Sequence, residues 1–285
     1  MRLGVHVSIA GGILQALDRA RRLECTAMQM FSHSPRGGPA PAFDAGELLA
    51  FDRQRRQADI APLAVHCPYI INLASPDRAI FRSSVRLYRE DYLRCGQLRA
   101  QYLVTHVGSH RGTGEEAGIA RVADAINETL KETDGTVMIL LENTAGSGQG
   151  IGYQFEQLAA IRSQVERKEL VGICLDTAHL FASGYAIHTP EGLEQTVAAF
   201  GRVVGFEHLK LIHLNDSKSA FDSHVDRHWH IGQGGIGLDA MRRIVTHPRL
   251  REVPMILETP KKTDADDPRN LALVRSFWAV EQHAS

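Results

Sequence analysis

The sequence lacks several features that would point to a specialised class of protein. Its 32 Lys+Arg and 33 Asp+Glu give a formal net charge of -1, which excludes a strongly basic nucleic-acid-binding coat and an acidic tail. No stretch approaches the length of a membrane span, and the start Met1–His6 carries no apolar signal core or cleavage site. We therefore expect a soluble, cytoplasmic protein without a membrane partner.

Cysteine is scarce, and its spacing excludes two further classes. The four cysteines, Cys25, Cys67, Cys95 and Cys174, form no C-x-x-C pair. A chain of 285 residues is also long enough to fold without disulfide staples. We therefore expect free thiols in a reducing compartment, in preference to a thiolate metal site or a catalytic cysteine.

The chain also lacks any proline- or serine-rich linker and any low-complexity segment. Its hydrophobic content of 44% is ample for a packed core, which excludes a disordered chain. We therefore expect one domain spanning residues 1–285. What the sequence has in excess is histidine, at 14, a residue that is awkward to bury unpaired and is the commonest metal ligand.

Short apolar runs recur along the chain, each followed by a longer amphipathic or polar segment. Their starts are 24 to 44 residues apart, which leaves room for one strand, one helix and two loops. Continuous apolar runs without alternation are typical of strands buried on both faces in a parallel sheet. The eight runs are Leu3–Val7, Ala27–Phe31, Leu63–His66, Tyr102–His106, Val137–Glu142, Val171–Asp176, Leu209–Asn215 and Val253–Glu258.

The segments between these runs carry helical periodicity. Apolar residues fall on one face of Glu115–Lys131 and of Arg82–Arg99, and Thr189-Pro190 supplies a capping hydroxyl before a proline at the first helical position. Eight strand–helix units predict an α/β fold, a (β/α)8 TIM barrel with its active site at the C-terminal face of the strands. The competing architecture, a doubly wound open sheet, usually has fewer strands and one glycine-rich nucleotide turn.

Six consecutive predicted strands carry a possible metal ligand at or near their C-terminal end. Because the C-terminal ends of barrel strands converge, these side chains would surround one cavity. Buried unpaired carboxylates are costly, and metal cations offset that cost. Three histidines and three carboxylates exceed the needs of one tetrahedral zinc and suit a binuclear site with a bridging carboxylate. The residues are His66, His106, Glu142, Asp176, His213 and Glu258.

Two local clusters extend this set. His179 follows Asp176 by three residues, where the strand turns into its helix. Asp226 and His228 alternate around Arg227, so an extended segment would point both ligands the same way. His179, Asp226 and His228 could therefore bind a further ion, although a solvated polar loop would explain the second cluster on its own.

These residues resemble the endonuclease IV family of zinc-dependent abasic-site (AP) endonucleases. The matching segments follow the family's order and span nearly the whole chain. They are His6–Gly12, His66–Leu73, His106–His110, Glu142–Gly148, Asp176–His179, His213–Lys218, Val225–His228 and Leu257–Thr259.

The resemblance implies three zinc ions per chain and a partition of the ligands. His66 and His106 would hold the first ion, and Glu142 would bridge the first and the second. Asp176, His213 and Glu258 would complete the second site, whereas His179, Asp226 and His228 would hold the third. All nine positions carry the family's residue type.

The resemblance also implies the reaction. The substrate would be duplex DNA lacking a base, cleaved on the 5′ side of the lesion to leave a 3′-hydroxyl and a 5′-deoxyribose phosphate. Glu142 and Glu258 would be the catalytic carboxylates: Glu142 would bridge two ions, and Glu258 would orient the hydroxide that attacks phosphorus. A monomer is expected, because one barrel completes the site.

Contacts to DNA are implied for five residues. Tyr69 and Ile70 would enter the helix at the lesion, since apolar wedges in the minor groove bend DNA and expose a nucleotide; the alternative is that Tyr69 packs under its own loop. Asn72 and Arg227 are candidate phosphate contacts. Arg36 is another, because arginine suits phosphate recognition, but Gly37-Gly38 stands where many relatives carry a bulky aromatic, which leaves the role of that loop open.

Two other functions compete with this interpretation. A divalent-metal sugar isomerase or epimerase on the same barrel would explain Glu142, Asp176, His213 and Glu258. It would not require His179, Asp226 and His228, nor a tyrosine wedge. A catalytically silent lesion-binding protein would predict a broken ligand set, yet all nine positions are filled.

Overall fold

The computed structural model describes residues 1–35, 40–133 and 135–282, and in this part of the chain eight parallel strands form one sheet. Each strand pairs with the one that follows it in the barrel, and every pairing is parallel. The strands are β1 (Leu3–Val5), β2 (Met28–Met30), β3 (Leu63–His66), β4 (Tyr102–His106), β5 (Met138–Glu142), β6 (Val171–Asp176), β7 (Leu209–His213) and β10 (Met255–Leu257).

The two ends of this sheet, β1 and β2, meet and close the barrel. His6 and Gln29 form a parallel bridge, and the Val7 amide donates to the Gln29 carbonyl at 2.7 Å. A second link lies at the start of both strands, where the Thr26 amide donates to the Leu3 carbonyl at 2.8 Å. The (β/α)8 TIM barrel predicted from the sequence is therefore confirmed.

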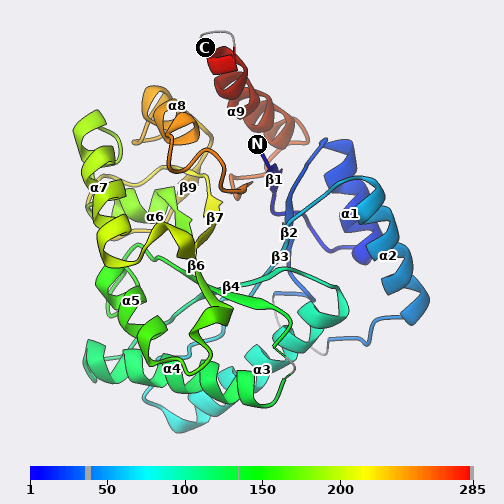
Figure 1. Ribbon diagram of the computed structural model, residues 1–285, viewed down its shortest axis with the longest axis vertical. Coiled ribbons are helices and arrows are strands. Elements are labelled where there is room, and N and C mark those ends of the chain that lie inside the picture. Colours follow the sequence, from blue (N-terminus) through cyan, green and yellow to red (C-terminus); the bar gives the residue numbers. More distant parts are fainter. Residues whose placement is uncertain (36–39, 134, 283–285) are drawn as a thin grey trace.

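Helices surround the strands, and Figure 1 shows them as an outer ring with α9 rising beside the N-terminus. Their amphipathic faces pack on the outer face of the sheet, where most of the large buried side chains lie. The helices are α1 (Ile13–Arg22), α2 (Ala45–Gln57), α3 (Arg78–Gln97), α4 (Glu115–Lys131), α5 (Phe155–Gln164), α6 (Thr177–Ala182), α7 (Pro190–Val203), α8 (Leu238–Thr246) and α9 (Asp266–Gln282), with short 3-10 turns η1 (Lys168–Leu170) and η2 (Phe206–His208).

The predicted strands agree with the observed ones to within one or two residues at each end. The start of α7 is also as predicted, because the Thr189 hydroxyl accepts from the Gly192 amide at 3.0 Å and Pro190 occupies the first turn. Two features were not expected. Two helices, α6 and α7, lie between β6 and β7, and the loop after β7 forms a small antiparallel pair of β8 (Asp216–Ser217) and β9 (His228–Trp229).

Small and medium apolar side chains fill the inside of the barrel. Along a strand, alternate side chains point to opposite faces, so the residue two positions further on points inward as well. Each member of this inner layer therefore has an inward-facing neighbour nearer the C-terminal mouth. The layer consists of Ala27, Ala64, Val104, Leu140, Cys174, Leu211 and Ile256.

Two expectations drawn from absences in the sequence can be compared with the structure. The four cysteines are free thiols, as predicted, and all four are buried. Among the residues described, no helix has both the length and the apolar character needed to cross a membrane.

A glycine at the barrel seam gives a test of this packing. Gly4 occupies the inward-facing position of β1, and an added Cβ would collide with the Ala27 carbonyl and approach the Ile256 side chain. We expect Gly4→Ala to lower the free energy of unfolding by about 1–3 kcal/mol, because overpacking forces neighbouring strands apart. Chemical denaturation followed by circular dichroism measures the change.

Gly96→Ala is the matched control. Gly96 lies in α3, and a Cβ there would make only an ordinary contact at 3.8 Å with Thr136. This variant should be about as stable as the parent or up to about 1 kcal/mol more stable, because alanine is the better helix former. Equal effects of both substitutions on the free energy of unfolding would contradict the conclusion that β1 and β2 pack too closely to admit a side chain at Gly4.

Candidate metal centre

Strand alternation places the predicted ligands at one level inside the barrel mouth. Six of them lie two residues after a member of the inner apolar layer: His66 after Ala64, His106 after Val104, and likewise Glu142, Asp176, His213 and Glu258. The same spacing from Ala27 adds Gln29 on β2, and His6 follows Gly4 on β1. Each of the eight strands thus contributes one polar side chain at this level.

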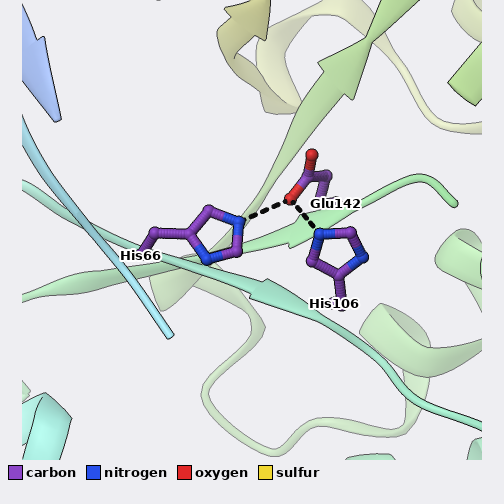
Figure 2. Close-up of side chains that lie close together, drawn as sticks. All are labelled: His66, His106 and Glu142. Atoms are coloured by element: carbon purple, nitrogen blue, oxygen red, sulfur yellow. Dashed lines mark hydrogen bonds and ion pairs between the residues drawn. The ribbon is translucent and has the colours of Figure 1, made fainter. Parts of the chain in front are cut away.

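Glu142, at the end of β5, lies at the middle of the cluster. Its Oε2 is 3.1 Å from His66 Nε2 and 3.3 Å from His106 Nε2, and Figure 2 shows both imidazoles approaching this one oxygen. Its Oε1 is 2.8 Å from His213 Nδ1. The two oxygens of this buried carboxylate therefore face two different groups of donors, as a bridging ligand requires.

A second group adjoins the first through Glu142. One ligand atom from each of Glu142, Asp176, His213 and Glu258 lies within 4.8 Å of all the others, which is close enough for one ion. The His66, His106 and Glu142 atoms meet the same criterion. Both groups have the members of the first two sites that the family resemblance implies, whereas the group that meets this criterion around His179 and His228 contains Asp176 in place of Asp226.

The third group is built partly from loops. Asp176 caps α6 by accepting from the His179 amide at 2.9 Å, and this turn aims the His179 ring back at the cluster. Asp226 approaches His179 Nε2 at 3.2 Å and His228 Nε2 at 3.3 Å, which brings the three predicted residues together. Asp176 Oδ2 also lies 3.4 Å from His228 Nε2, so Asp176 stands between the second and third groups.

Three of the histidines are oriented by backbone carbonyls. Nδ1 of His66 donates to the Cys67 carbonyl at 2.7 Å, and Nδ1 of His179 donates to the Asn143 carbonyl at 2.8 Å. His228 Nδ1 lies 3.3 Å from the Glu258 carbonyl. Metal-binding histidines commonly donate their second N–H in this way, which fixes the tautomer. The Nε2 lone pairs then face carboxylate oxygens, and only a proton or a cation between them makes these contacts favourable.

The charges of the cluster give the same result. Burial opposes ionisation of Glu142, but the neighbouring histidines outweigh it and hold the pKa of Glu142 well below its usual range. Burial disfavours the charged ring of His179, yet Asp176 and Asp226 raise its pKa to about 10. In the metal-free protein, protons thus offset the carboxylates, and divalent cations would replace them. The donor set, with nitrogen and carboxylate oxygen ligands, fits zinc.

Three polar residues of the site were missed by the sequence interpretation. Gln29, fully buried, bonds to both His213 and Glu258. The side-chain amide of Asn215 donates to Asp176 Oδ2 at 2.7 Å and accepts from the Glu258 amide, while that of Asn143 bonds to the Asp176 backbone. Gln29 carried a usable signal, because it follows Ala27 with the same spacing as the ligands.

The predicted wedge residues stand at the rim of the mouth. Tyr69 is 71% exposed and Ile70 57%, so Tyr69 does not pack beneath its own loop. The Tyr69 ring centroid lies 5.8 Å from that of His66 and 5.9 Å from that of His106. Tyr69 also lines two clefts of about 700 Å³ each, one bordered by His6, Phe31 and Lys261 and the other by His106, Ser109 and Arg111.

The residues predicted to contact phosphates differ in their surroundings. Arg227 is exposed beside Asp226. Asn72 lines the second cleft, and its amide links two loops by donating to the Ser109 carbonyl at 3.1 Å and accepting from the Ser109 amide at 3.0 Å. Arg36, with Gly37 and Gly38, lies outside the described residues.

Comparison with known proteins agrees with this geometry. Residues 17–277 match the family described as "Xylose isomerase-like TIM barrel". A "Probable endonuclease 4" of Chloroflexus aggregans is 46% identical over 281 residues, which cover 98% of each chain. The crystal structure of endonuclease IV from Thermus thermophilus superimposes with a TM-score of 0.88 at 33% identity, covering 98% of this chain and 100% of that one.

Sugar-epimerase structures share the fold alone. A D-tagatose 3-epimerase-like protein matches with a TM-score of 0.70 at 17% identity over the full length of both chains. The two relatives described above, at 46% and 33% identity, are named probable endonuclease 4 and endonuclease IV, in agreement with the motifs found in the sequence. The chain belongs to the endonuclease IV family of the xylose isomerase-like TIM barrels.

Proposed function

We propose that this protein is a DNA-repair endonuclease that hydrolyses the phosphodiester on the 5′ side of abasic sites in duplex DNA. The products are a 3′-hydroxyl and a 5′-deoxyribose phosphate. One observation carries the proposal: nine ligand-type side chains meet at one mouth, below an exposed tyrosine and isoleucine. We further propose that it acts as a monomeric, cytoplasmic enzyme of one domain.

We assign three zinc ions to the cluster. His66, His106 and Glu142 hold the first, and Glu142, Asp176, His213 and Glu258 hold the second. His179, Asp226 and His228 hold the third, supported by the contacts of 3.2 and 3.3 Å that Asp226 makes to the two rings. When bound, these ions neutralise the phosphodiester, lower the pKa of water and stabilise the departing oxygen.

The chain's own residues position the reactants. Glu142 is fully buried and contacted by His66, His106 and His213, so it keeps the first two groups at a fixed separation. Glu258 is anchored through Oε1 by His6 and Gln29, which leaves Oε2 directed at the cluster. Oε2 accepts a hydrogen bond from the attacking water and aligns it with the phosphorus.

Residues around the mouth select the lesion. Tyr69 and Ile70 fill the space of the missing base, because their apolar surface is already presented to solvent above the cluster. Arg227, Arg36 and the remaining amide hydrogen of Asn72 contact phosphates. Three Zn²⁺ would change the formal net charge from -1 to +5, and this positive charge is concentrated where the scissile phosphate must lie.

The alternative of a sugar isomerase or epimerase uses only part of the site. Glu142, Asp176, His213 and Glu258 would satisfy it. It leaves His179, Asp226 and His228 without a purpose, although they lie within hydrogen-bonding distance of one another. It also leaves Tyr69 unexplained, whereas the nuclease uses every one of these groups.

Metal analysis and a nicking assay test the proposal together. We expect the purified protein to contain about three zinc ions per chain and to nick a duplex with a single abasic analogue on the 5′ side of the lesion. Removal of the ions by a chelator should abolish nicking, and added zinc should restore it. One ion per chain with no nicking of the analogue would overturn the proposal.

Glu258→Gln tests the role assigned to the carboxylate at the end of β10. We expect this variant to bind the abasic duplex and to cleave it at least about 100-fold more slowly, because the neutral amide no longer holds the water in line. Single-turnover cleavage and a gel-shift titration measure the two quantities. Glu252→Gln, at an exposed carboxylate, is the control and should cleave normally. A normal rate for Glu258→Gln would remove it from the mechanism.

Tyr69→Ala tests the wedge. Removal of the ring should weaken binding of the abasic duplex by about 1–3 kcal/mol, the usual value of an aromatic side chain stacked on bases, and should leave the metal content unchanged. Leu49→Ala removes a comparably exposed apolar side chain from α2 and should bind DNA normally. If both variants bind the lesion as tightly as the parent, Tyr69 does not enter the helix.

A further inference from the structure

We propose that Gln29 is a positioning residue that prepares the second metal site. Its side-chain amide determines which nitrogen of His213 and which oxygen of Glu258 face the ion. The inference rests on the zinc assignment of the proposed function and extends it to β2, a strand that supplies no ligand to that assignment.

The neighbours of Gln29 determine which way its side-chain amide is turned. Its side chain is fully buried, and its strand, β2, pairs with β3 and bridges to His6 after β1. One end lies 2.6 Å from Glu258 Oε1 and 2.9 Å from His6 Nδ1. A carboxylate only accepts hydrogen bonds, so the amide NH2 group must face Glu258. The carbonyl Oε1 of Gln29 then has to face the other way.

The orientation of His213 follows from that of Gln29. Gln29 Oε1 lies 2.8 Å from His213 Nε2 and accepts only, so Nε2 must carry the hydrogen. In the neutral ring the lone pair is then on Nδ1. That atom lies 2.8 Å from Glu142 Oε1 and 3.2 Å from Glu258 Oε2.

Because of these orientations, several hydrogen-bond acceptor atoms point toward one position in the site. His213 Nδ1, Glu142 Oε1 and Glu258 Oε2 all direct lone pairs to it, and Asp176 Oδ2 lies 4.0 Å from His213 Nδ1. Without Gln29, His213 could place its hydrogen on Nδ1 and bond directly to a carboxylate, which would occupy the ion's position. His213 is also distinct from His66, His179 and His228, whose Nε2 atoms face the cluster.

Backbone carbonyls orient His66 and His179, but a side chain from another strand orients His213. In the described part of the chain, Gln29 is the one residue whose side chain bonds to both His213 and Glu258. Loss of partners that orient ligands typically weakens metal binding about 10–100-fold.

Gln29→Met tests the role, because methionine has a similar length and volume but cannot make these hydrogen bonds. We expect one of three zinc ions to pass to a competing chromophoric chelator at a concentration about 10–100-fold lower than the parent requires. In ¹H–¹⁵N spectra of the zinc-loaded protein, the His213 Nε2–H signal should be present in the parent and lost or broadened in the variant. Cleavage should slow through kcat, with little change in KM.

Gln101→Met is the matched control. The Gln101 amide accepts from the Leu63 backbone at the opposite end of the barrel, at 2.7 Å, and its loss should leave zinc retention unchanged. Gln29→Asn is a second variant for the case that Gln29→Met fails to fold. It keeps the amide but is one methylene too short to reach both partners, so it should lose the same ion.

The outcomes separate this inference from the proposed function. Retention of all three ions and an unchanged His213 spectrum in the Gln29 variants would overturn the positioning role while leaving the nuclease intact. A parent protein that binds three zinc ions but fails to nick abasic DNA would refute the nuclease and leave the role of Gln29 standing, because the chelator assay uses no DNA. A parent without zinc would overturn both.

Discussion

Buried acceptor atoms that converge without intervening donors are the constraint on which this site depends. Glu142 and Asp176 are fully buried, and carbonyl bonds turn the Nε2 lone pairs of His66 and His179 inward. Such an arrangement is unfavourable unless cations occupy it, since a buried carboxylate without a partner is costly. In the metal-free protein, protons offset the charge of the buried carboxylates, as the raised pKa of His179 indicates. Divalent metal ions would offset this charge more effectively.

The strands of the barrel position the first two groups of ligands, and the loop after β7 positions part of the third. Asp216, fully buried after β7, accepts from the backbone amides of Ser217, Gly234, Ile236 and Gly237. These bonds hold β8, and β8 pairs with β9, which begins with His228. The first two groups are therefore built on the sheet, while the third depends on a hairpin and on Asp226, whose side chain is 44% exposed. In the proposed assignment, an ion held by this third group would exchange with solvent most readily.

The fold is shared with epimerases, so the fold does not identify the reaction. The distinguishing features lie at the rim and in the third group. A small sugar needs an enclosed pocket, whereas a DNA duplex needs an open mouth with protruding side chains. The exposed Tyr69, which lines two open clefts, and the exposed Ile70 next to it form a mouth of the second kind. The sequence relatives named as endonucleases agree with this distinction.

By itself, the sequence predicted the eight strands and the barrel, because apolar runs are local patterns. A polar residue near the end of six strands also marked six ligand candidates, and two local clusters added His179, Asp226 and His228. Helix starts such as Thr189-Pro190 were readable for the same reason. Only the tertiary structure decided how those residues meet: that Asp176 lies between two groups, that Gln29 joins the cluster, and that Asn215 and Asn143 hold it. These contacts join residues up to 229 positions apart, and no local pattern encodes which donor meets which acceptor across a closed barrel.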